Sequence, residues 1–217
     1  MSQMKSAAPV ATLIGDLVGS RRARDRVELH QRFREALAEV ETAVPALTSL
    51  RITVGDEFQG CFQRLGEAAS AALRLRLLLL PEADVRFGIG WGEVTVLEGA
   101  PRVEDGPGWW AARDAIEVVA RDAGKAALRS TRTLYRRAPR TAGPDERPVN
   151  AALRLRDQVV GSLDARSLSV LRGLLDGVPQ TSLAEQLGVS ASAVSQRIRA
   201  DGLGVVVAAE SDLGGLR

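Results

Sequence analysis

Two aspartates stand where carboxylates could hold a metal ion. Asp16 follows the apolar run 10–14, and Asp56 sits at a Gly-Asp turn in the stretch ITVGDEFQG, residues 52–60. Carboxylates on neighbouring strands are ligands that Mg²⁺ or Mn²⁺ takes, whereas one aspartate alone holds Mg²⁺ poorly because the ion gives up water reluctantly. Such a pair can place cations that activate an oxygen nucleophile and neutralise a triphosphate. The alternative is that each aspartate is an ordinary turn residue, since Gly-Asp is common in turns.

The residues after Asp16 suit a phosphate group. A glycine-containing loop that leads to a helix presents backbone N–H groups, which can cradle phosphates. We therefore expect nucleotide contacts from Leu17, Val18, Gly19, Ser20 and Arg21. Two readings of the arginines at 21, 22 and 24 stay open, since they either contact phosphate or solvate the start of a helix. Two readings of Glu57 stay open as well, because strand alternation points it away from Asp56 and toward solvent, or else it joins the metal site.

Composition excludes several other kinds of chemistry. The chain has 217 residues, of which 45% are hydrophobic and 26% charged, as in ordinary soluble domains. Cys61 and His30 are each the only residue of their type, which excludes a disulfide framework and a Cys/His zinc site, and we assign both to structure. The apolar run 77–80 is too short to span a membrane, and the start of the chain has no apolar signal core. We therefore expect a cytoplasmic protein without a membrane partner.

Strands and helices are expected to alternate along the first two thirds of the chain. The expected elements are a strand at 10–14, a helix from the N-cap Asp25 to about Val40, two strands over 47–62 joined at Gly55-Asp56, a helix at 65–80, two strands within 85–99 and a helix at 108–125. This alternation predicts an α+β fold with one mainly antiparallel sheet covered by helices. The proline- and arginine-rich segment 136–149 has no apolar anchor and predicts a linker between domains 8–135 and 150–217.

The C-terminal segment predicts two short helices that cross at a sharp turn. Gly188 stands where the turn needs a left-handed backbone, and Ser190 can cap the second helix. This pattern resembles the helix-turn-helix of bacterial regulators and region 4 of sigma factors, whose second helix enters the major groove of DNA. The residues then expected to face DNA are Ser190, Ala191, Ser192, Ser195, Gln196, Arg197 and Arg199. Gln196 suits adenine, and arginines suit guanine or phosphate.

Charge limits how strongly this small module can bind DNA. Residues 161–203 contain four arginines and four acids, so a single copy gains little from counterion release. We therefore expect DNA binding to need a dimer or help from the arginine-rich linker. A helical packing or dimerisation module without DNA binding is the alternative.

Three segments in order resemble the class III adenylate and guanylate cyclases and the related GGDEF domains. They are IGDLVGSR (14–21), VGDEFQG (54–60) and VRFGIGWGEV (85–94). The resemblance implies a cyclase or ferredoxin-like palm domain in which Asp16 and Asp56 hold metal and the acid at Glu57 is functional. It also implies that Arg113 stabilises the transition state and that Asp105 lies near the base-recognising residues. Its other implication is a homodimer, because cyclase sites form between subunits.

The same segments, with DGPGWWAARDAI (105–116) and the C-terminal helix-turn-helix, resemble the SatD family over about residues 10–203. That resemblance implies a regulatory or stress-associated role. In the cyclase family an asparagine that orients the ribose stands where this chain has Trp109. Trp109 and Trp110 are interpreted as core or interface aromatics.

Three functions follow from these patterns. The first is a DNA-binding regulator, dimeric on double-stranded DNA, whose cyclase-like domain binds a nucleoside triphosphate or related nucleotide with Mg²⁺ or Mn²⁺. The second is a nucleotidyl cyclase or transferase that forms a 3′–5′ phosphodiester. The third is a degenerate cyclase fold that serves only as a dimerisation platform. The tail 204–217 is open between a final helix and a β-wing.

Overall fold

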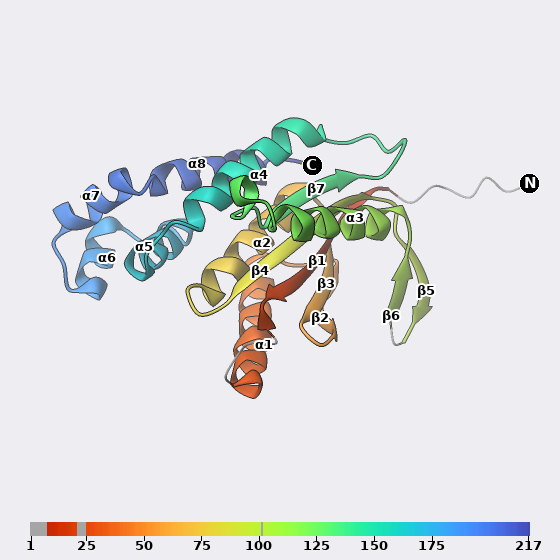
Figure 1. The fold of residues 1–217 in the computed structure, drawn as a ribbon, viewed down its shortest axis with the longest axis horizontal. Coiled ribbons are helices and arrows are strands. Elements are labelled where there is room, and N and C mark those ends of the chain that lie inside the picture. Colours follow the sequence, from red (N-terminus) through yellow and green to blue (C-terminus); the bar gives the residue numbers. More distant parts are fainter. Residues whose placement is uncertain (1–7, 21–24, 101) are drawn as a thin grey trace, which may run out of the picture.

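The core of the protein is a five-stranded sheet with strand order β2-β3-β1-β4-β7 (Figure 1). The computed structural model describes residues 8–20, 25–100 and 102–217. The strands are β1 (Val10–Val18), β2 (Thr48–Val54), β3 (Glu57–Phe62), β4 (Asp84–Gly92) and β7 (Thr133–Arg137). Neighbouring strands are antiparallel except β4 and β7, which are parallel. The predicted α+β class with a mainly antiparallel sheet is confirmed.

Helices α1 (Arg26–Ala43) and α2 (Leu65–Leu79) cover one face of this sheet. Asp25 caps α1 as predicted, because its carboxylate accepts hydrogen bonds from the backbone N–H groups of Val27 and Glu28. The core beneath these helices contains three phenylalanines in edge-to-face contact, Phe33, Phe58 and Phe87, with ring centroids 5.5 and 6.2 Å apart. Such aromatic pairs stabilise a core beyond the area that they bury.

Helix α3 (Pro107–Asp122) covers the opposite face and packs unusually close to β4. The close approach is possible because β4 presents Gly88, Gly90 and Gly92 beneath the helix. A Cβ atom on Gly90 would lie only 2.1 Å from the carbonyl oxygen of Gly108. Thr12 Oγ1 donates a hydrogen bond to that same carbonyl at 2.8 Å, so β1 also helps to fix the start of α3.

Strands β5 (Thr95–Gly99) and β6 (Arg102–Asp105) form a separate two-stranded sheet beside β2 and β3 (Figure 1). The sequence predicted a strand in this region but not the pairing partner β6. Glu104 holds the hairpin to the main sheet, since its Oε1 accepts a hydrogen bond from Thr48 Oγ1 at 2.7 Å. The β5–β6 hairpin is therefore attached to β2 through the buried carboxylate of Glu104.

Helix α4 (Glu146–Val160) covers the outer edge of β7. Asn150 replaces a neighbouring strand there, because its amide bonds both the N–H and the C=O of Tyr135 at 2.8 and 2.9 Å. Asp157 accepts from the N–H groups of Arg132 and Thr133 in the same way. The predicted linker 136–149 thus contains the end of β7 and the first turn of α4, and only residues 138–145 lie between the two elements.

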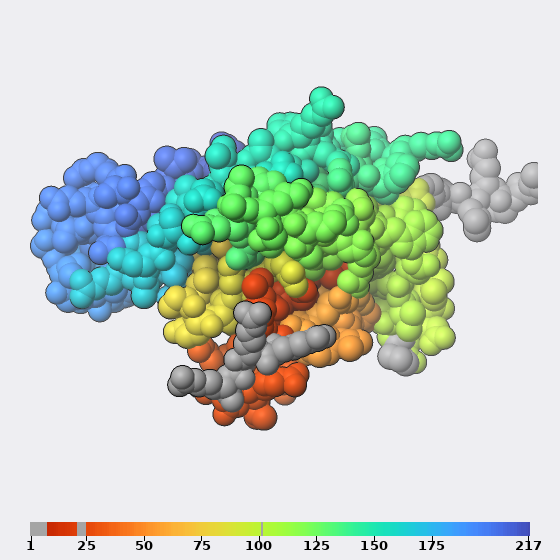
Figure 2. Space-filling model, viewed as in Figure 1, coloured from red at the N-terminus to blue at the C-terminus, as the bar shows by residue number. Residues whose placement is uncertain are grey.

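Three of the remaining helices form one end of the molecule (Figure 2), and the last one leads from there back to the sheet domain (Figure 1). They are α5 (Ala165–Leu175), α6 (Gln180–Leu187), α7 (Ala191–Ala200) and α8 (Leu203–Gly214). The tail is therefore a helix, and it returns to the sheet domain, where Leu213 joins the main core and Leu216 O accepts from Gly66 N at 3.1 Å. Although α8 begins with an apolar run, no helix in the described part of the chain is long and apolar enough to cross a membrane.

Candidate functional site

Asp16 lies in the middle of a row of charged side chains that crosses three strands. Its Cα is in register with Glu57 on β3 and with Arg86 on β4. Residues directly opposite each other in antiparallel strands point to the same face of the sheet. That face is the one covered by α3, because Glu57 contacts Arg113 of that helix. The register therefore brings these side chains together, although they lie far apart in the sequence.

Each carboxylate in this row forms an ion pair with an arginine. Arg86 donates from Nε to Asp16 Oδ1 at 2.8 Å and from Nη2 to Oδ2 at 2.6 Å. Arg113 binds both oxygens of Glu57 at 2.7 Å in the same two-pronged geometry. The hydrogen bond to Glu57 is the main interaction that raises the pKa of Arg113, and the charge of Asp16 contributes as well. The four side chains form an electrically neutral array in which the two carboxylates are neighbours and each has its own arginine.

The two predicted metal-binding aspartates line one surface pocket of about 500 Å³, which we call the Asp16 pocket. Its lining is Asp16, Leu17, Val18, Gly19, Ser20, Asp56 and Arg86. Gly19 has a left-handed backbone with φ of +73°, and Gly55 with φ of +65° forms the turn that presents Asp56. The loop predicted to contact phosphate and both aspartates therefore share one cavity. Arg21, which was predicted to join them, lies outside the described residues.

The donor chemistry of the Asp16 pocket suits a divalent cation, but its ligand atoms are already engaged. Carboxylate oxygens are the ligands that Mg²⁺ and Mn²⁺ take. Both oxygens of Asp16 accept from Arg86, and both oxygens of Glu57 accept from Arg113. In the described part of the chain, no three His, Cys, Asp or Glu side chains are grouped to hold a metal ion. A cation at Asp16 would therefore compete with the guanidinium for the same carboxylate.

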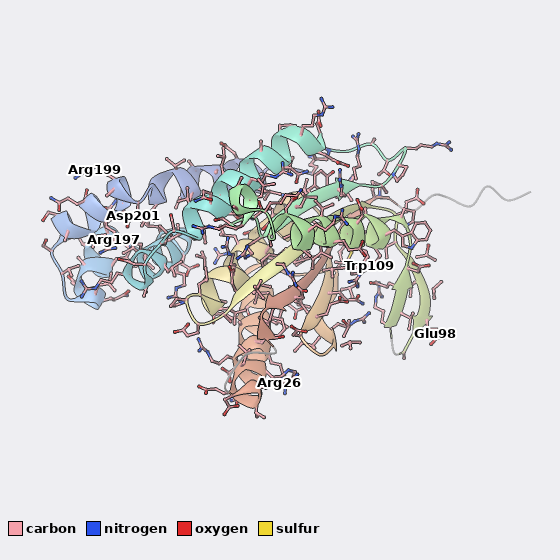
Figure 3. The ribbon with its side chains drawn as sticks, in the orientation of Figure 1. Arg26, Glu98, Trp109, Arg197, Arg199 and Asp201 are labelled. Atoms are coloured by element: carbon pink, nitrogen blue, oxygen red, sulfur yellow. The ribbon has the colours of Figure 1, made fainter. Side chains whose placement is uncertain are left out.

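Asp105, which the cyclase resemblance placed near the base-recognising residues, and Trp109 both lie outside the lining of the Asp16 pocket. Asp105 is on β6 and accepts a hydrogen bond from Trp110 Nε1 at 2.8 Å, so it does not line the Asp16 pocket. Trp109 is only 7% exposed and packs with Ile14 and Ile116 between α3 and the sheet (Figure 3). The interpretation of Trp109 as a core aromatic is confirmed. Trp110 is 61% exposed.

Cys61 has a structural environment, as predicted. It is buried under α3, and burial together with the charge of Glu104 raises the pKa of its thiol to about 12. A thiol is nucleophilic only as the thiolate, so this residue is inert near neutral pH.

Helices α6 and α7 meet at the turn that the sequence predicted. Gly188 is left-handed with φ of +63°, and Ser190 Oγ accepts from Ala193 N at 3.2 Å as the N-cap of α7. The side chains of α7 then divide between two directions. Those of Ser192, Gln196 and Arg199 are exposed, together with Ser190 and Ala191, and Ser195 is half-buried.

Arg197 departs from this expected DNA-facing set. Its Nη1 binds both oxygens of Asp164 at 2.9 Å and also donates to Ser167, so its guanidinium is engaged with the start of α5. Arg197 and Arg199 lie on different sides of α7 (Figure 3). The reason is helical geometry, because positions two apart on a helix do not share a face. Arg197 fixes the packing of α7 against α5.

The comparison with known families decides where this chain belongs. The SatD family model matches residues 10–212, which includes the Asp16 pocket and helices α4 to α7. The chain belongs to the SatD family. No curated protein matches the sequence.

Several solved structures are similar to this SatD-family chain in fold. One is a bacterial light-regulated adenylyl cyclase, with TM-score 0.44 and 12% identity over 61% of this chain and 44% of that one. A second is the adenylyl cyclase CyaB from P. aeruginosa, with TM-score 0.38 and 15% identity over 48% of this chain and 69% of that one. A third is the Regulator of Polyketide Synthase Expression from Bifidobacterium adolescentis, with TM-score 0.28 and 11% identity over 96% of this chain and 86% of that one. This chain therefore spans less than half the length of the light-regulated cyclase, and these partial superpositions add nothing to the site geometry.

Arg86 is the residue of the SatD-family site that the sequence analysis missed. It lies inside VRFGIGWGEV, a segment that was singled out for its resemblance to the cyclases. The signal that could identify it is the register of β1 against β4, which places an arginine opposite Asp16. The ion pair of Arg113 with Glu57 was also missed, because it too joins residues that lie far apart in the sequence.

The contact between α5 and α7 in this SatD-family chain predicts a measurable acid sensitivity. Hydrogen bonds from the Ser167 N–H, from Arg197 and from the Ser167 hydroxyl lower the pKa of Asp164 to about 2. An unfolded aspartate has a pKa of about 3.9. Because the folded value is the lower one, the ionised carboxylate stabilises the fold above about pH 4, and this stabilisation is lost as the pH falls toward 2. We expect the Tm of Asp164→Asn to fall less steeply than that of the wild type between about pH 4 and pH 2.

Thermal unfolding followed by circular dichroism at stepped pH measures this difference. Asp212→Asn removes the same charge from an exposed position near the end of α8 and is the matched control. If Asp164→Asn and the wild type have the same slope, the Asp164 contact does not couple to folding.

Proposed function

We propose that this protein is a cytoplasmic DNA-binding regulator that binds a nucleoside triphosphate or a related nucleotide in the Asp16 pocket. The observation that carries the proposal is the shared lining of that pocket, where two aspartates meet a glycine-containing loop and an arginine. Arginine recognises phosphate oxygens bidentately, and exposed backbone N–H groups add to that recognition. Carboxylates of Asp16 and Asp56 would hold Mg²⁺ or Mn²⁺, whose charge neutralises the phosphates when it is bound.

Helices α5 to α8 would provide the DNA-binding part of this function. The exposed residues of α7 include Gln196, which can bind adenine, and Arg199, which can bind guanine or phosphate. Helix α8 links this module to the sheet domain, since Arg156 of α4 binds Glu210 of α8 at 3.0 Å. A change at the sheet domain can therefore alter how two modules are spaced in a homodimer on two-fold DNA.

Binding is better supported than turnover. A cyclase needs a polar group to orient the ribose, but Trp109 is buried and its Nε1 has no hydrogen-bond partner among the described residues. Arg113, the residue expected to stabilise a transition state, is paired with Glu57. The absence of pyrophosphate or cyclic-nucleotide release during incubation with each triphosphate and Mn²⁺ is the result expected for a sensor.

Nucleotide binding is tested by thermal unfolding with each nucleoside triphosphate, with and without Mg²⁺ or Mn²⁺. A ligand at about 100 times its Kd should stabilise the fold by about 2.7 kcal/mol, or about 5–10 °C in Tm for a chain of this size. Asp56→Asn should lose this stabilisation. If no triphosphate shifts the Tm of the wild type, the result contradicts nucleotide binding and favours the degenerate cyclase fold.

DNA binding is tested by fluorescence anisotropy against a pool of labelled genomic fragments at low salt. We expect Gln196→Ala and Arg199→Ala to weaken binding, Gln196→Ala by about 1–3 kcal/mol on the preferred fragments. Gln158→Ala changes an exposed glutamine on α4 and is the matched control. If the wild type binds no fragment even at low salt, the DNA-binding part of the proposal is wrong.

A further inference from the structure

The ion pair between Asp16 and Arg86 is built into the sheet. The two residues are direct cross-strand partners, so their Cβ atoms are held close together before the side chains reach out. The guanidinium meets the carboxylate through two parallel hydrogen bonds, and the side chains are 24% and 27% exposed. Pairs with this fork geometry are stronger and more directional than a point contact. Arg86 therefore bonds both oxygens with which Asp16 would bind a metal ion, and its positive charge disfavours a second cation there.

Two other carboxylates near Arg86, those of Asp84 and Glu57, already have arginine partners. Asp84 lies two residues earlier on β4, and its carboxylate accepts from Arg76 Nε at 2.8 Å and Arg132 Nε at 2.7 Å. Glu57 is held by Arg113. Asp56 also lines the pocket and has no ion pair within the described residues. When a cation takes Asp16 and Asp56, the displaced guanidinium has no carboxylate left to bind.

A phosphate group in the same pocket would supply the missing partner. Its oxygens accept from a guanidinium in the same bidentate way as a carboxylate does. We propose that Arg86 is an internal cation that occupies Asp16 until a divalent cation and a phosphate enter the pocket together. In this exchange the metal binds Asp16, and Arg86 turns from the carboxylate to the phosphate. The inference rests on the proposed nucleotide function and adds a mechanism that makes metal and phosphate binding cooperative.

The exchange has two measurable consequences. Removing the competing guanidinium should tighten the binding of metal alone, and it should also remove the advantage that phosphate gives to the metal, because coupling between two ligands is reciprocal. We expect Arg86→Gln to bind Mn²⁺ about tenfold more tightly than the wild type. Inorganic phosphate should tighten Mn²⁺ binding to the wild type several-fold and to Arg86→Gln by less than about twofold.

Titration of the full-length protein with Mn²⁺, followed by the electron paramagnetic resonance signal of the free ion, measures both quantities. Arg32→Gln is the matched control, because it removes an arginine from a surface pair with Glu82 at 3.2 Å, away from the pocket. Arg86→Lys keeps the charge without the fork and should have an intermediate affinity for Mn²⁺. If Arg86→Gln does not fold, Arg86→Lys provides the comparison with the wild type. The double variant Asp16→Asn, Arg86→Gln should lose the increase in Mn²⁺ affinity that Arg86→Gln shows alone.

The outcomes separate this inference from the proposed function. Equal Mn²⁺ affinity in Arg86→Gln and the wild type would overturn the inference, as would a gain that persists in the double variant. If the wild type binds triphosphate equally well without metal and neither protein binds Mn²⁺, the inference is wrong while nucleotide binding stands. If Arg86→Gln gains Mn²⁺ affinity and inorganic phosphate couples to Mn²⁺ but no nucleotide binds, the inference stands and the proposed ligand is wrong.

Discussion

Replacing Asp157 by alanine is expected to lower the free energy of unfolding by about 3–5 kcal/mol. The side chain is 2% exposed and accepts hydrogen bonds from Arg76, from the N–H groups of Arg132 and Thr133 at 2.7 and 2.6 Å, and from the Thr133 hydroxyl. Alanine would leave a buried guanidinium and two buried N–H groups with one partner fewer, and each such group keeps its desolvation cost. A domain is stable by only about 5–15 kcal/mol, so the loss is a large share of the total.

Urea unfolding followed by circular dichroism measures the effect as a lower midpoint. Asp176→Ala is the matched control, because it removes a carboxylate that binds Arg74 at 2.6 Å but is 55% exposed. We expect that control to cost less than about 1 kcal/mol. If the two variants lose the same stability, then Asp157 does not hold α4 against the edge of β7.

The local parts of this fold could be predicted from sequence. The cap of α1 at Asp25 and the hairpin at Gly55 depend on residues within a few positions of one another, and both are confirmed. Strand β7 could not be predicted, because its five residues include two arginines and no apolar alternation. It is a strand only because β4 pairs with it on one side and Asn150 and Asp157 of α4 satisfy its other edge.

The same distinction between local and distant contacts applies to the candidate site. The sequence indicated that Asp16 and Asp56 would meet, since each stands at the end of a strand with a glycine turn nearby. It did not indicate that Arg86 would pair with Asp16, because the two residues lie 70 positions apart. A shift of one residue in the strand register would move Arg86 to the other face of the sheet. Arg197 was misplaced on a smaller scale, by the choice of helix face. The roles of metal, nucleotide and DNA stay predictions.

Alanine at Gly90 is expected to lower the free energy of unfolding by about 3 kcal/mol, near the upper end of overpacking effects. The added Cβ would lie 2.1 Å from the carbonyl oxygen of Gly108 and 2.5 Å from the backbone nitrogen of Ala112. Backbone atoms in a helix cannot rotate away as a flexible side chain can, so α3 must lift from β4. The hydrogen bond from Thr12 to Gly108 would then lengthen, and the cost would appear as a lower urea midpoint.

The displacement of α3 should also reach the Asp16 pocket, which distinguishes it from a local packing defect. Arg113 directly follows Ala112, one of the residues that contact Gly90, so lifting the helix draws its guanidinium from Glu57 and leaves that carboxylate unpaired beside Asp16. Gly99→Ala is the matched control, because this strand glycine has no atom within 4 Å of the added Cβ and should change stability by less than about 0.5 kcal/mol. If Gly90→Ala is as stable as Gly99→Ala, then α3 does not sit on the glycines of β4. In that case the geometry that pairs Arg113 with Glu57, and with it the neutral array around Asp16, would have to be fixed by some other contact.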